Sequence, residues 1–357
     1  MAVVSPMPPL CASDQRLYPA TDYWHATPAG ARVPPGFKEW SHFSVLADDF
    51  DLLANFSLTE ALSPSPKAPL VPRLTLLFRD QYGHWDGDVE NFKLDQTRMA
   101  EGDPDVAFGC NSARFIDGSY RIELTLPARG IEASLRLQPL AHPTVANNIR
   151  LSESESFRWV VVPNLGASGE VSAPGRRYTV ADAPAYHDRN TGCFAWGGGF
   201  TWEWATILPV DPAEPWSLSY SRIANRERGV TLSQSLMLWR QTALFRKFYG
   251  RDLAIACPSR LSQSPALRLP RVAALLVPGT AADVPRHLQV DASAYGDAVS
   301  LHMRFDDFAQ IIIPNDAWPG VTTLSEIRGS AMVTGRIGDE AVAFDARVQA
   351  ELNHASC

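Results

Sequence analysis

The sequence feature that most restricts the fold is an Asp-Gly pair, Asp117-Gly118, set between two stretches in which polar and apolar residues alternate over 111–126. This pair favours a tight two-residue hairpin turn, because such turns require positive φ angles. The alternation continues over 131–137, where apolar side chains occupy every second position. We therefore predict an antiparallel meander with one apolar face over 111–137.

Short strands of the same kind are predicted along most of the chain. Residues 63–67 predict a loop, because their prolines cannot donate to a central β-ladder. Residues 236–248 are also compatible with a short helix. Further strands are expected at 40–46, 51–58, 73–79, 159–163, 177–180, 201–208, 216–223, 232–239, 298–305, 327–337 and 342–352. This texture predicts an all-β barrel or sandwich fold, with less than about a fifth of the residues in helices.

The length of 357 residues exceeds what one ordinary hydrophobic core organises, so two domains are expected. Residues 1–36 are rich in proline and alanine and predict an irregular N-terminal arm, which contacts the body through Tyr18, Tyr23 and Trp24. The strand texture on both sides of residue 200 predicts an N-terminal β-domain over 37–200 and a C-terminal one over 201–357.

Charge and cysteine usage exclude several classes of protein. The 32 basic and 39 acidic residues give a net charge of −7, which argues against a nucleic-acid partner. Five scattered cysteines without a CxxC pair predict neither a zinc site nor a disulfide framework, and they fit a reducing cytoplasm. The N-terminus lacks a basic start typical of a secretory signal, and no apolar run approaches the roughly 20 residues of a membrane helix. We expect a cytoplasmic protein that is at most peripheral to a membrane. Its oligomeric state stays open.

The usual cofactor motifs are absent from the sequence. Neither GxGxxG nor GxxxxGK[ST] occurs, so no phosphate cradle is predicted. The eight histidines show no HxH or HExxH spacing, and no GxSxG nucleophile elbow is present. We therefore expect neither a metal nor a nucleotide cofactor.

The densest group of chemically active residues lies over 185–192, with the sequence Ala-Tyr-His-Asp-Arg-Asn-Thr-Gly. In a strand, Tyr186, Asp188 and Asn190 share one face, and His187 and Arg189 share the other. A carboxyl group beside a phenol, an amide and apolar walls suits a general acid. The alternative is a polar strand end followed by a turn, with Asp188 in a structural ion pair or cap.

Two other segments allow a functional and a structural interpretation. Residues 84–90 carry three carboxyl groups and a histidine, which predict an acidic loop turning at Gly87 or, less favoured, a site. Four tryptophans lie on both sides of the segment 185–192 in the sequence, namely Trp159, Trp196, Trp202 and Trp204. They belong either to a core or to a pocket for an elongated apolar ligand or a carbocation.

Taken together, these motifs resemble the carotenoid 1,2-hydratase family, also called hydroxyneurosporene synthase-like or AttH-like. The resemblance rests on Trp159, the turn over 174–178, Tyr-x-Asp-x-Asn-x-Gly over 186–192, Trp-x-Trp over 202–204, Lys-Glu-Trp over 38–40 and the last hairpin over 329–352. It covers most of residues 37–352.

The resemblance implies two tandem lipocalin-like antiparallel β-barrels and an apolar cavity near their junction. It also implies cofactor-independent chemistry on a hydrophobic isoprenoid or polyketide, with Asp188 as the acid, Tyr186 as its neighbour and Trp159 as a site tryptophan. The hydratases tend to carry a histidine two residues before that tryptophan, where this chain has Phe157. An apolar ring in place of an imidazole favours cyclisation over hydration.

The resulting expectation is a proton-initiated terpenoid cyclase of the isomerase or lyase type. Asp188 donates the proton, and His187 or Asn190 orients it. The walls of the substrate cavity are expected to be formed by Tyr186, Phe157, Trp159, Trp196, Trp202 and Trp204. The alternatives are a hydratase that adds water to an isoprenoid double bond, a Diels–Alder-type cyclase of a polyene, and a non-catalytic lipocalin-like carrier.

Overall fold

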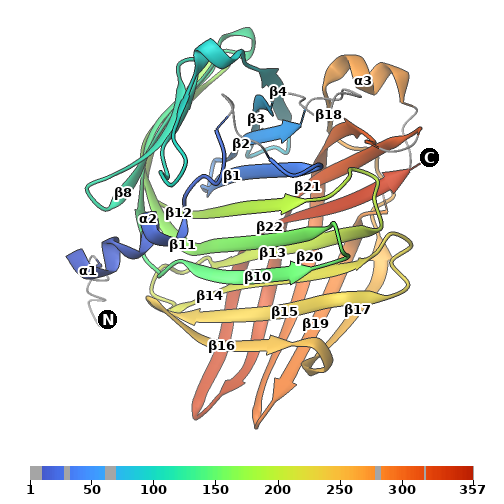
Figure 1. The fold of residues 1–357 in the computed structure, drawn as a ribbon. Helices are drawn as coiled ribbons and strands as arrows, with labels where there is room; N and C mark the ends of the chain where they lie inside the picture. Colours follow the sequence, from blue (N-terminus) through green and yellow to red (C-terminus); the bar gives the residue numbers. More distant parts are fainter. Residues whose placement is uncertain (1–9, 28–32, 61–69, 278–282, 317–318, 357) are drawn as a thin grey trace. The chain divides into compact units, whose positions relative to one another are not determined.

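The computed structural model describes residues 10–27, 33–60, 70–277, 283–316 and 319–356 (Figure 1). It is 68% strand and 7% helix, which confirms the prediction of an all-β fold with little helix. The chain divides into two compact units between Phe194 and Ala195. The loop expected over 63–67 lies outside the described residues.

The N-terminal unit is built on one antiparallel sheet whose strand order is β4-β3-β2-β1-β12-β11-β9-β8-β7-β6-β5, with β10 paired to β11. Its strands are β1 (Phe37–Leu46), β2 (Phe50–Glu60), β3 (Leu70–Asp80), β4 (Trp85–Asn91), β5 (Thr97–Met99), β6 (Val106–Phe108), β7 (Asn111–Ile116), β8 (Ser119–Leu126), β9 (Ile131–Pro139), β10 (Thr144–Arg150), β11 (Ser156–Ala173) and β12 (Arg176–Cys193). Helices α1 (Ala12–Gln15) and α2 (Leu17–Thr21) and 3₁₀ turns at Leu94–Gln96 and Pro127–Arg129 complete the unit.

The C-terminal unit has a second sheet, in the order β16-β15-β14-β13-β22-β21-β20-β19-β17. The three-residue strand β18 joins β20 in parallel, and the other pairings are antiparallel. Its strands are β13 (Phe200–Pro209), β14 (Trp216–Asn225), β15 (Thr231–Arg240), β16 (Ala243–Tyr249), β17 (Leu253–Arg260), β18 (Leu267–Leu269), β19 (Pro285–Ala294), β20 (Asp297–Pro314), β21 (Val321–Ile337) and β22 (Glu340–Ser356). Helix α3 (Arg271–Leu276) and a 3₁₀ turn at Gly250–Asp252 complete it.

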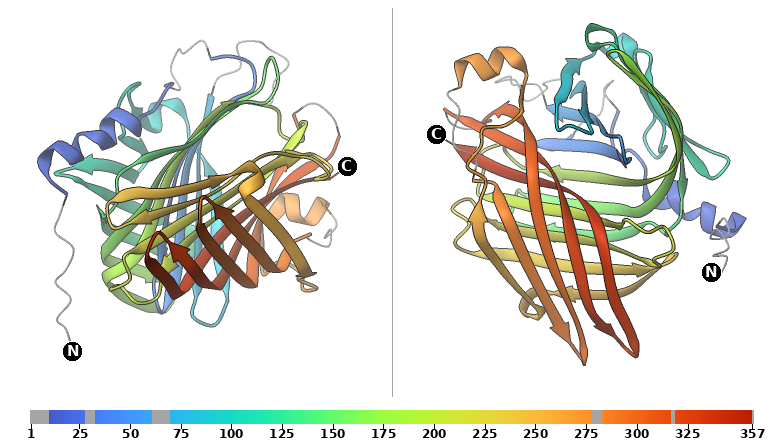
Figure 2. Two further views of the ribbon diagram at one scale, coloured as in Figure 1. Left: turned by 90° about the horizontal axis from the view of Figure 1, so that it is seen from below. Right: turned by 180° about the vertical axis from the view of Figure 1, so that it is seen from behind.

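Both sheets repeat one connection pattern. Each begins with a four-stranded meander, β1 to β4 or β13 to β16, and the first strand of that meander pairs with the last strand of its unit. Strand β12 therefore lies between β1 and β11, and β22 lies between β13 and β21. The long neighbouring strands β20, β21 and β22 can be followed in both views of Figure 2. The two sheets are thus tandem copies of one architecture.

Each unit has its own hydrophobic cluster on one face of its sheet. The N-terminal cluster includes Phe43, Val162 and Ala185, and the C-terminal cluster includes Ala205, Ile327 and Ala350. Strand alternation therefore fixes which side chains of β12 and β22 point toward the cluster and which point away. No helix among the described residues is long and apolar enough to cross a membrane.

The meander over 111–137 forms as expected. Strands β7 and β8 turn at Asp117 and Gly118, whose φ angles are 51° and 72°. In the N-terminal arm, Tyr18 and Trp24 are fully buried, and the Tyr18 hydroxyl donates a 2.7 Å hydrogen bond to the carbonyl oxygen of Ala141. The arm includes the short helices α1 and α2.

Two local expectations were wrong. The helix considered over 236–248 is instead the end of β15 and most of β16, joined by a turn at Gln241 with a φ of 53°. The acidic segment expected to form a loop at Gly87 is strand β4, paired with β3. Gly87 permits this pairing, because a Cβ at that position would lie 2.1 Å from the carbonyl oxygen of Leu76. Asp86 and Asp88 lie 3.8 and 3.6 Å from Arg129.

Candidate functional site

Asp188 lies in the middle of strand β12, on the face of the sheet that points away from the N-terminal hydrophobic cluster. The adjacent residue His187 pairs with Phe43, a member of that cluster, so alternation places Asp188 on the other face. The Asp188 side chain is nevertheless only 1% exposed. A buried carboxyl group on this face needs hydrogen-bond partners, and the surrounding strands supply them.

Three side chains donate hydrogen bonds to the Asp188 carboxyl group. Tyr186 donates its hydroxyl to Oδ2 at 2.8 Å, and Trp159 donates its indole Nε1–H to the same oxygen at 3.1 Å. Asn190 donates its Nδ2–H to Oδ1 at 2.8 Å. The predicted shared face of Tyr186, Asp188 and Asn190 is therefore present, and Trp159 joins it from β11, where it pairs with Asn190.

His42 and Ser44 of β1 complete this face from the other side. They are the direct cross-strand partners of Asp188 and Tyr186, so their side chains point to the same face. Burial, together with the nearby charge of His187, lowers the pKa of His42 to about 3, so its imidazole is neutral at physiological pH. The buried Ser44 hydroxyl has no hydrogen-bond partner in the structure.

Aromatic rings continue the same face beyond Asn190. Trp40 of β1 pairs with Asn190, and its ring lies 6.1 Å from that of Phe157 and 6.3 Å from that of Phe194. The rings of Phe157 and Phe194 are also 6.3 Å apart. The carboxyl group therefore adjoins an apolar, aromatic surface, and Phe157 belongs to it as expected from its place beside Trp159.

His187 is on the opposite face, toward the interior of the N-terminal unit. Its Nε2 lies 2.8 Å from Asp22 Oδ2, and its ring stacks on Phe43 at 4.1 Å between centroids. Arg189 points the same way, donates its Nε–H to Asp22 and lies over the ring of Trp24. The structure thus separates His187 from the carboxyl that it was expected to orient, and Asn190, Tyr186 and Trp159 contact that carboxyl instead.

Asp22 is a fully buried carboxylate that ties the N-terminal arm to β12. It also accepts a 2.7 Å hydrogen bond from the Tyr120 hydroxyl. Burial by itself would raise the pKa of Asp22, but the charges of Arg189 and His187 outweigh it and hold the pKa well below its ordinary value. The inner face of β12 is therefore a charged, hydrogen-bonded anchor for the strand whose outer face carries Asp188.

The remaining predicted tryptophans belong to the C-terminal unit. Trp202 donates its indole N–H to Glu351 of β22, and its ring lies 5.8 Å from that of Trp196. Trp204 pairs directly with Glu351 across β13 and β22. All three tryptophans are buried. They form a group around Glu351 within the C-terminal unit.

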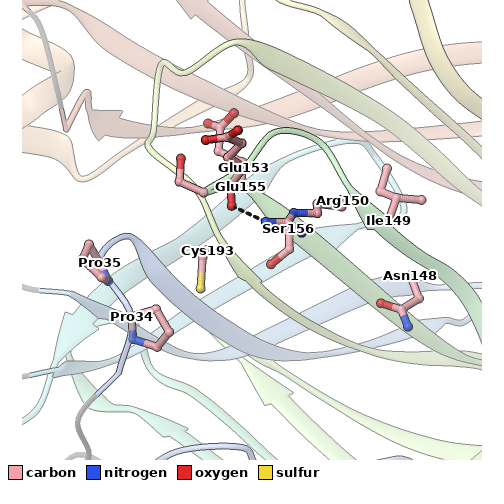
Figure 3. Close-up of a pocket in the computed structure, with 10 residues that line it drawn as sticks. Pro34, Pro35, Asn148, Ile149, Arg150, Glu153, Glu155, Ser156 and Cys193 are labelled. Carbon is pink, nitrogen blue, oxygen red and sulfur yellow. Dashed lines mark hydrogen bonds between the residues drawn. The ribbon is translucent and has the colours of Figure 1, made fainter.

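A cleft of about 620 Å³ lies in the N-terminal unit, between the β10–β11 hairpin and Pro34 and Pro35 (Figure 3). Its wall includes Cys193 and Arg150, which donates a 2.8 Å hydrogen bond to the carbonyl oxygen of Glu153. Asp188 is not among its lining residues. The cleft therefore lies beside the end of β12 and away from the candidate acid.

Four potentially functional residues escaped the sequence interpretation. His42, Asp22, Glu326 and Glu351 are buried polar groups whose partners are distant in sequence. The one signal available for the glutamates was a charged residue inside an apolar strand, as in Ala350-Glu351-Leu352. Within the described residues, no three His, Cys, Asp or Glu side chains are grouped so as to hold a metal ion.

Comparison with known proteins was made by family model, by curated sequence and by structure. No family model matches the chain, and no curated protein matches it in sequence. Among solved structures, a protein from Nitrosomonas europaea provisionally named AttH matches with a TM-score of 0.61 at 15% identity, over 99% of this chain and 98% of that one.

Kievitone hydratase from Nectria haematococca matches with a TM-score of 0.58 at 11% identity, over 94% of this chain and 95% of its own. CghA matches with a TM-score of 0.58 at 10% identity, over 94% of this chain and 98% of its own. The tandem β-barrel architecture implied by the motifs is thus the architecture of this chain, which shares its fold with AttH, kievitone hydratase and CghA.

Proposed function

We propose that the protein catalyses a cofactor-independent, proton-initiated cyclisation of a hydrophobic isoprenoid or terpenoid, with Asp188 as the acid. The observation that carries the proposal is the buried Asp188 carboxyl group, held by three side-chain donors beside an aromatic surface. A carrier for a neutral isoprenoid has no use for such a group, because burying a carboxyl costs free energy.

The environment of Asp188 suits a group that must hold a proton and then release it. Burial favours the neutral acid before the reaction, whereas the donors Tyr186, Asn190 and Trp159 stabilise the carboxylate that remains afterwards. A carboxyl group has about four lone-pair positions, so three accepted hydrogen bonds are compatible with an acid proton. The donors are in place before the reaction, so little reorganisation accompanies the transfer.

In the proposed step, the Asp188 O–H bond breaks and a C–H bond forms at the end of a carbon–carbon double bond, or an O–H bond forms at an epoxide. The resulting cation is attacked by the next double bond, which closes a ring. Transfer of a proton from the cyclised cation to the Asp188 carboxylate then restores both a double bond and the acid, so the product is an isomer of the substrate. Trp40, Phe157 and Trp159 stabilise the cation through their ring faces.

A second candidate function, hydration, is favoured by one observation, the position of His42. The sequence places an apolar ring at Phe157, but the neighbouring strand supplies an imidazole directly opposite Asp188. Because the pKa of His42 is lowered to about 3, its ring is neutral and can accept a hydrogen bond from a water molecule that attacks the cation, while the Asp188 carboxylate takes up the proton that this water releases. Whether the reaction ends in cyclisation or in hydration then depends on whether water reaches the cation.

The test is product analysis by mass spectrometry after incubation with linear prenyl alcohols, their terminal epoxides and prenylated phenols in D₂O. Cyclisation gives an isomer of the substrate, with deuterium retained where a carbon atom was protonated, whereas hydration adds one water. Asp188→Asn keeps the shape of the side chain and removes the acid proton, so we expect it to abolish turnover. Asp182→Asn, an exposed site on the same strand, is the matched control.

Circular dichroism of both variants establishes that the fold is retained. Near-full activity of a folded Asp188→Asn variant would falsify the role of Asp188. Binding of the prenyl compounds without any product would identify a carrier in place of an enzyme.

A further inference from the structure

Glu326 and Glu351 form a buried pair of carboxyl groups in the C-terminal unit. They are direct cross-strand partners on β21 and β22, and they lie on the face that points away from the C-terminal hydrophobic cluster. Glu326 is 2% exposed and Glu351 is 5% exposed. As cross-strand partners on one face, the two side chains lie close together, and Gln349 donates a hydrogen bond to Glu326 Oε2 at 3.4 Å. Two adjacent carboxyl groups can hydrogen-bond to each other only when one of them carries a proton.

The surroundings favour retention of this proton. Burial raises the pKa of the Glu351 carboxyl group, and it outweighs the opposing hydrogen bonds from Trp202, Glu326 and Trp204. Two neighbouring carboxylates also repel each other, so one of them stays protonated. The pair resembles the carboxyl dyads that enzymes use as acids, in which neither group titrates alone.

Arg328 and Glu203 are charged residues on strands next to the pair. Arg328 lies two residues from Glu326 on the same face and donates to the carbonyl oxygens of Gly329 and Val348 at 2.9 and 3.0 Å. Glu203 of β13 points to the opposite face, where it accepts hydrogen bonds from Tyr220 and Arg222.

Two buried hydroxyl groups beside the pair lack hydrogen-bond partners. Thr206 lies two residues from Trp204 on the same face of β13, and its cross-strand partners are Ser219 and Gln349. The side-chain oxygens of Thr206 and Ser219 are fully buried and form no hydrogen bond in the structure. An unpaired buried hydroxyl destabilises a protein, so these groups point to a polar atom that a ligand brings.

The position of Glu351 in its sheet repeats that of Asp188. Each carboxyl group is on the last strand of its unit, between the first strand and the penultimate one, on the face away from the hydrophobic cluster. The neighbours of Asp188 are His42 and Val161, and those of Glu351 are Trp204 and Glu326. The tandem architecture therefore places a buried carboxyl group at the same point in both units.

We propose that Glu326 and Glu351 form a second ligand-binding site, in which the shared proton is donated in a hydrogen bond to a carbonyl or hydroxyl oxygen of an apolar molecule. Trp202 and Trp204 supply its aromatic wall, and Thr206 and Ser219 supply further polar contacts. The site uses residues of the C-terminal unit alone, so it does not depend on the chemistry assigned to Asp188.

The shared proton is tested by infrared difference spectroscopy at neutral pH. The spectrum of the wild type minus that of Glu351→Gln should contain the carbonyl stretch of a protonated carboxyl group, shifted in D₂O. Glu326→Gln should remove the same band. Glu340→Gln, an exposed member of an ion pair with Arg240, is the control and should remove none. Absence of the band from both difference spectra overturns the proposal.

The ligand is tested by calorimetric titration with geranylacetone, an isoprenoid ketone, and with β-farnesene, a hydrocarbon of similar shape. The wild type and Asp188→Asn should bind the ketone about tenfold more tightly than the hydrocarbon, as one net hydrogen bond predicts. This preference should disappear in Glu351→Gln and decrease in Thr206→Val. Equal affinities for the two probes, or no binding of the ketone, overturn the proposal. Loss of the preference in Asp188→Asn overturns the independence of the two sites.

Discussion

Asp188 and Glu351 occupy equivalent positions in the two sheets, yet their surroundings give them different chemistry. Both are buried on the last strand of their unit. Asp188 accepts hydrogen bonds from a phenol, an amide and an indole, whereas Glu351 accepts one from an indole and lies directly across the strands from a second carboxyl group. Depth of burial alone therefore does not determine what a carboxyl group can do, because the side chains that surround it decide which protonation state is stabilised.

The reverse faces of the two strands differ as well. Behind Asp188, His187 and Arg189 contact the buried carboxylate of Asp22. Behind Glu351, Ala350 and Leu352 join the hydrophobic cluster. The pKa of Asp22 is lowered by its cationic partners, whereas that of Glu351 is raised by burial. The inner face of β12 is thus anchored by charged groups directly behind its buried acid, whereas β22 has only apolar side chains at the equivalent positions.

The largest expected effect follows from removing the charge behind Asp188. Asp22→Asn leaves the Arg189 guanidinium buried without its carboxylate, so the free energy of unfolding should fall by about 3–5 kcal/mol. Urea denaturation followed by circular dichroism measures it. Asp49→Asn breaks an exposed pair with Arg176 and should cost at most about 1 kcal/mol. Equal losses in the two variants would remove the contrast between the strands.

A smaller effect is expected from removing one donor to Asp188. Tyr186→Phe deletes a hydrogen bond to the carboxylate that forms on proton transfer, and such a bond contributes roughly 1.5–3 kcal/mol. Turnover should therefore fall by about 10- to 100-fold, with kcat affected more than KM. Tyr249→Phe alters an exposed tyrosine and should leave the rate unchanged. A Tyr186→Phe variant with wild-type kcat contradicts the assignment of this hydrogen bond.

The opposite pKa shifts give the two carboxyl groups opposite effects on stability. Asp22, with its lowered pKa, stabilises the fold above its unfolded value of about 3.9, and this contribution is lost as the pH falls. Glu351 has a raised pKa and therefore stabilises the fold most when it is protonated. This contribution is complete below the unfolded-state pKa of about 4.3, and it is lost as the pH rises from there through the pKa of the folded state.

Glu351→Gln should remove that decline in stability with rising pH, and at neutral pH it should leave the melting temperature equal or slightly higher. Thermal melts at a series of pH values measure the slope. An unchanged slope would show that Glu351 does not titrate between the folded and unfolded states.

Removal or addition of metal ions should have no effect on stability or turnover. If Glu326 and Glu351 share a proton, they do not require a cation to neutralise them. Dialysis against a chelator, or addition of Ca²⁺, should leave the melting temperature and any turnover unchanged. A stabilisation that saturates with Ca²⁺ would show that the pair is a cation site.

Much of the N-terminal half of the candidate site could be predicted from the sequence. Strand alternation alone places Tyr186, Asp188 and Asn190 on one face, because it depends only on neighbouring residues. Alternation also places His187 and Asp188 on opposite faces. The structure shows that the partner of His187 is Asp22, which lies 165 residues earlier in the chain. The expectation that His187 orients the acid rested on nearness in sequence, which in a strand does not mean a shared face.

The groups that could not be predicted depend on register between distant strands. His42 meets Asp188, and Glu326 meets Glu351, only because of the particular alignment of their strands. A shift of one residue would turn either partner to the other face. Strand β4 was missed for another reason, since three carboxyl groups near a glycine usually indicate a loop, whereas Gly87 permits close pairing with β3.

Pairing of the first strand with the last in both sheets has a consequence for biosynthesis. When β1 leaves the ribosome, its neighbour β12 has not yet been made, and β13 likewise precedes β22 by more than a hundred residues. Neither sheet can be completed until its last strand is present, and such distant pairings slow folding. That same strand carries Asp188 in one unit and Glu351 in the other, so each sheet acquires its buried acid together with the strand that joins its two parts.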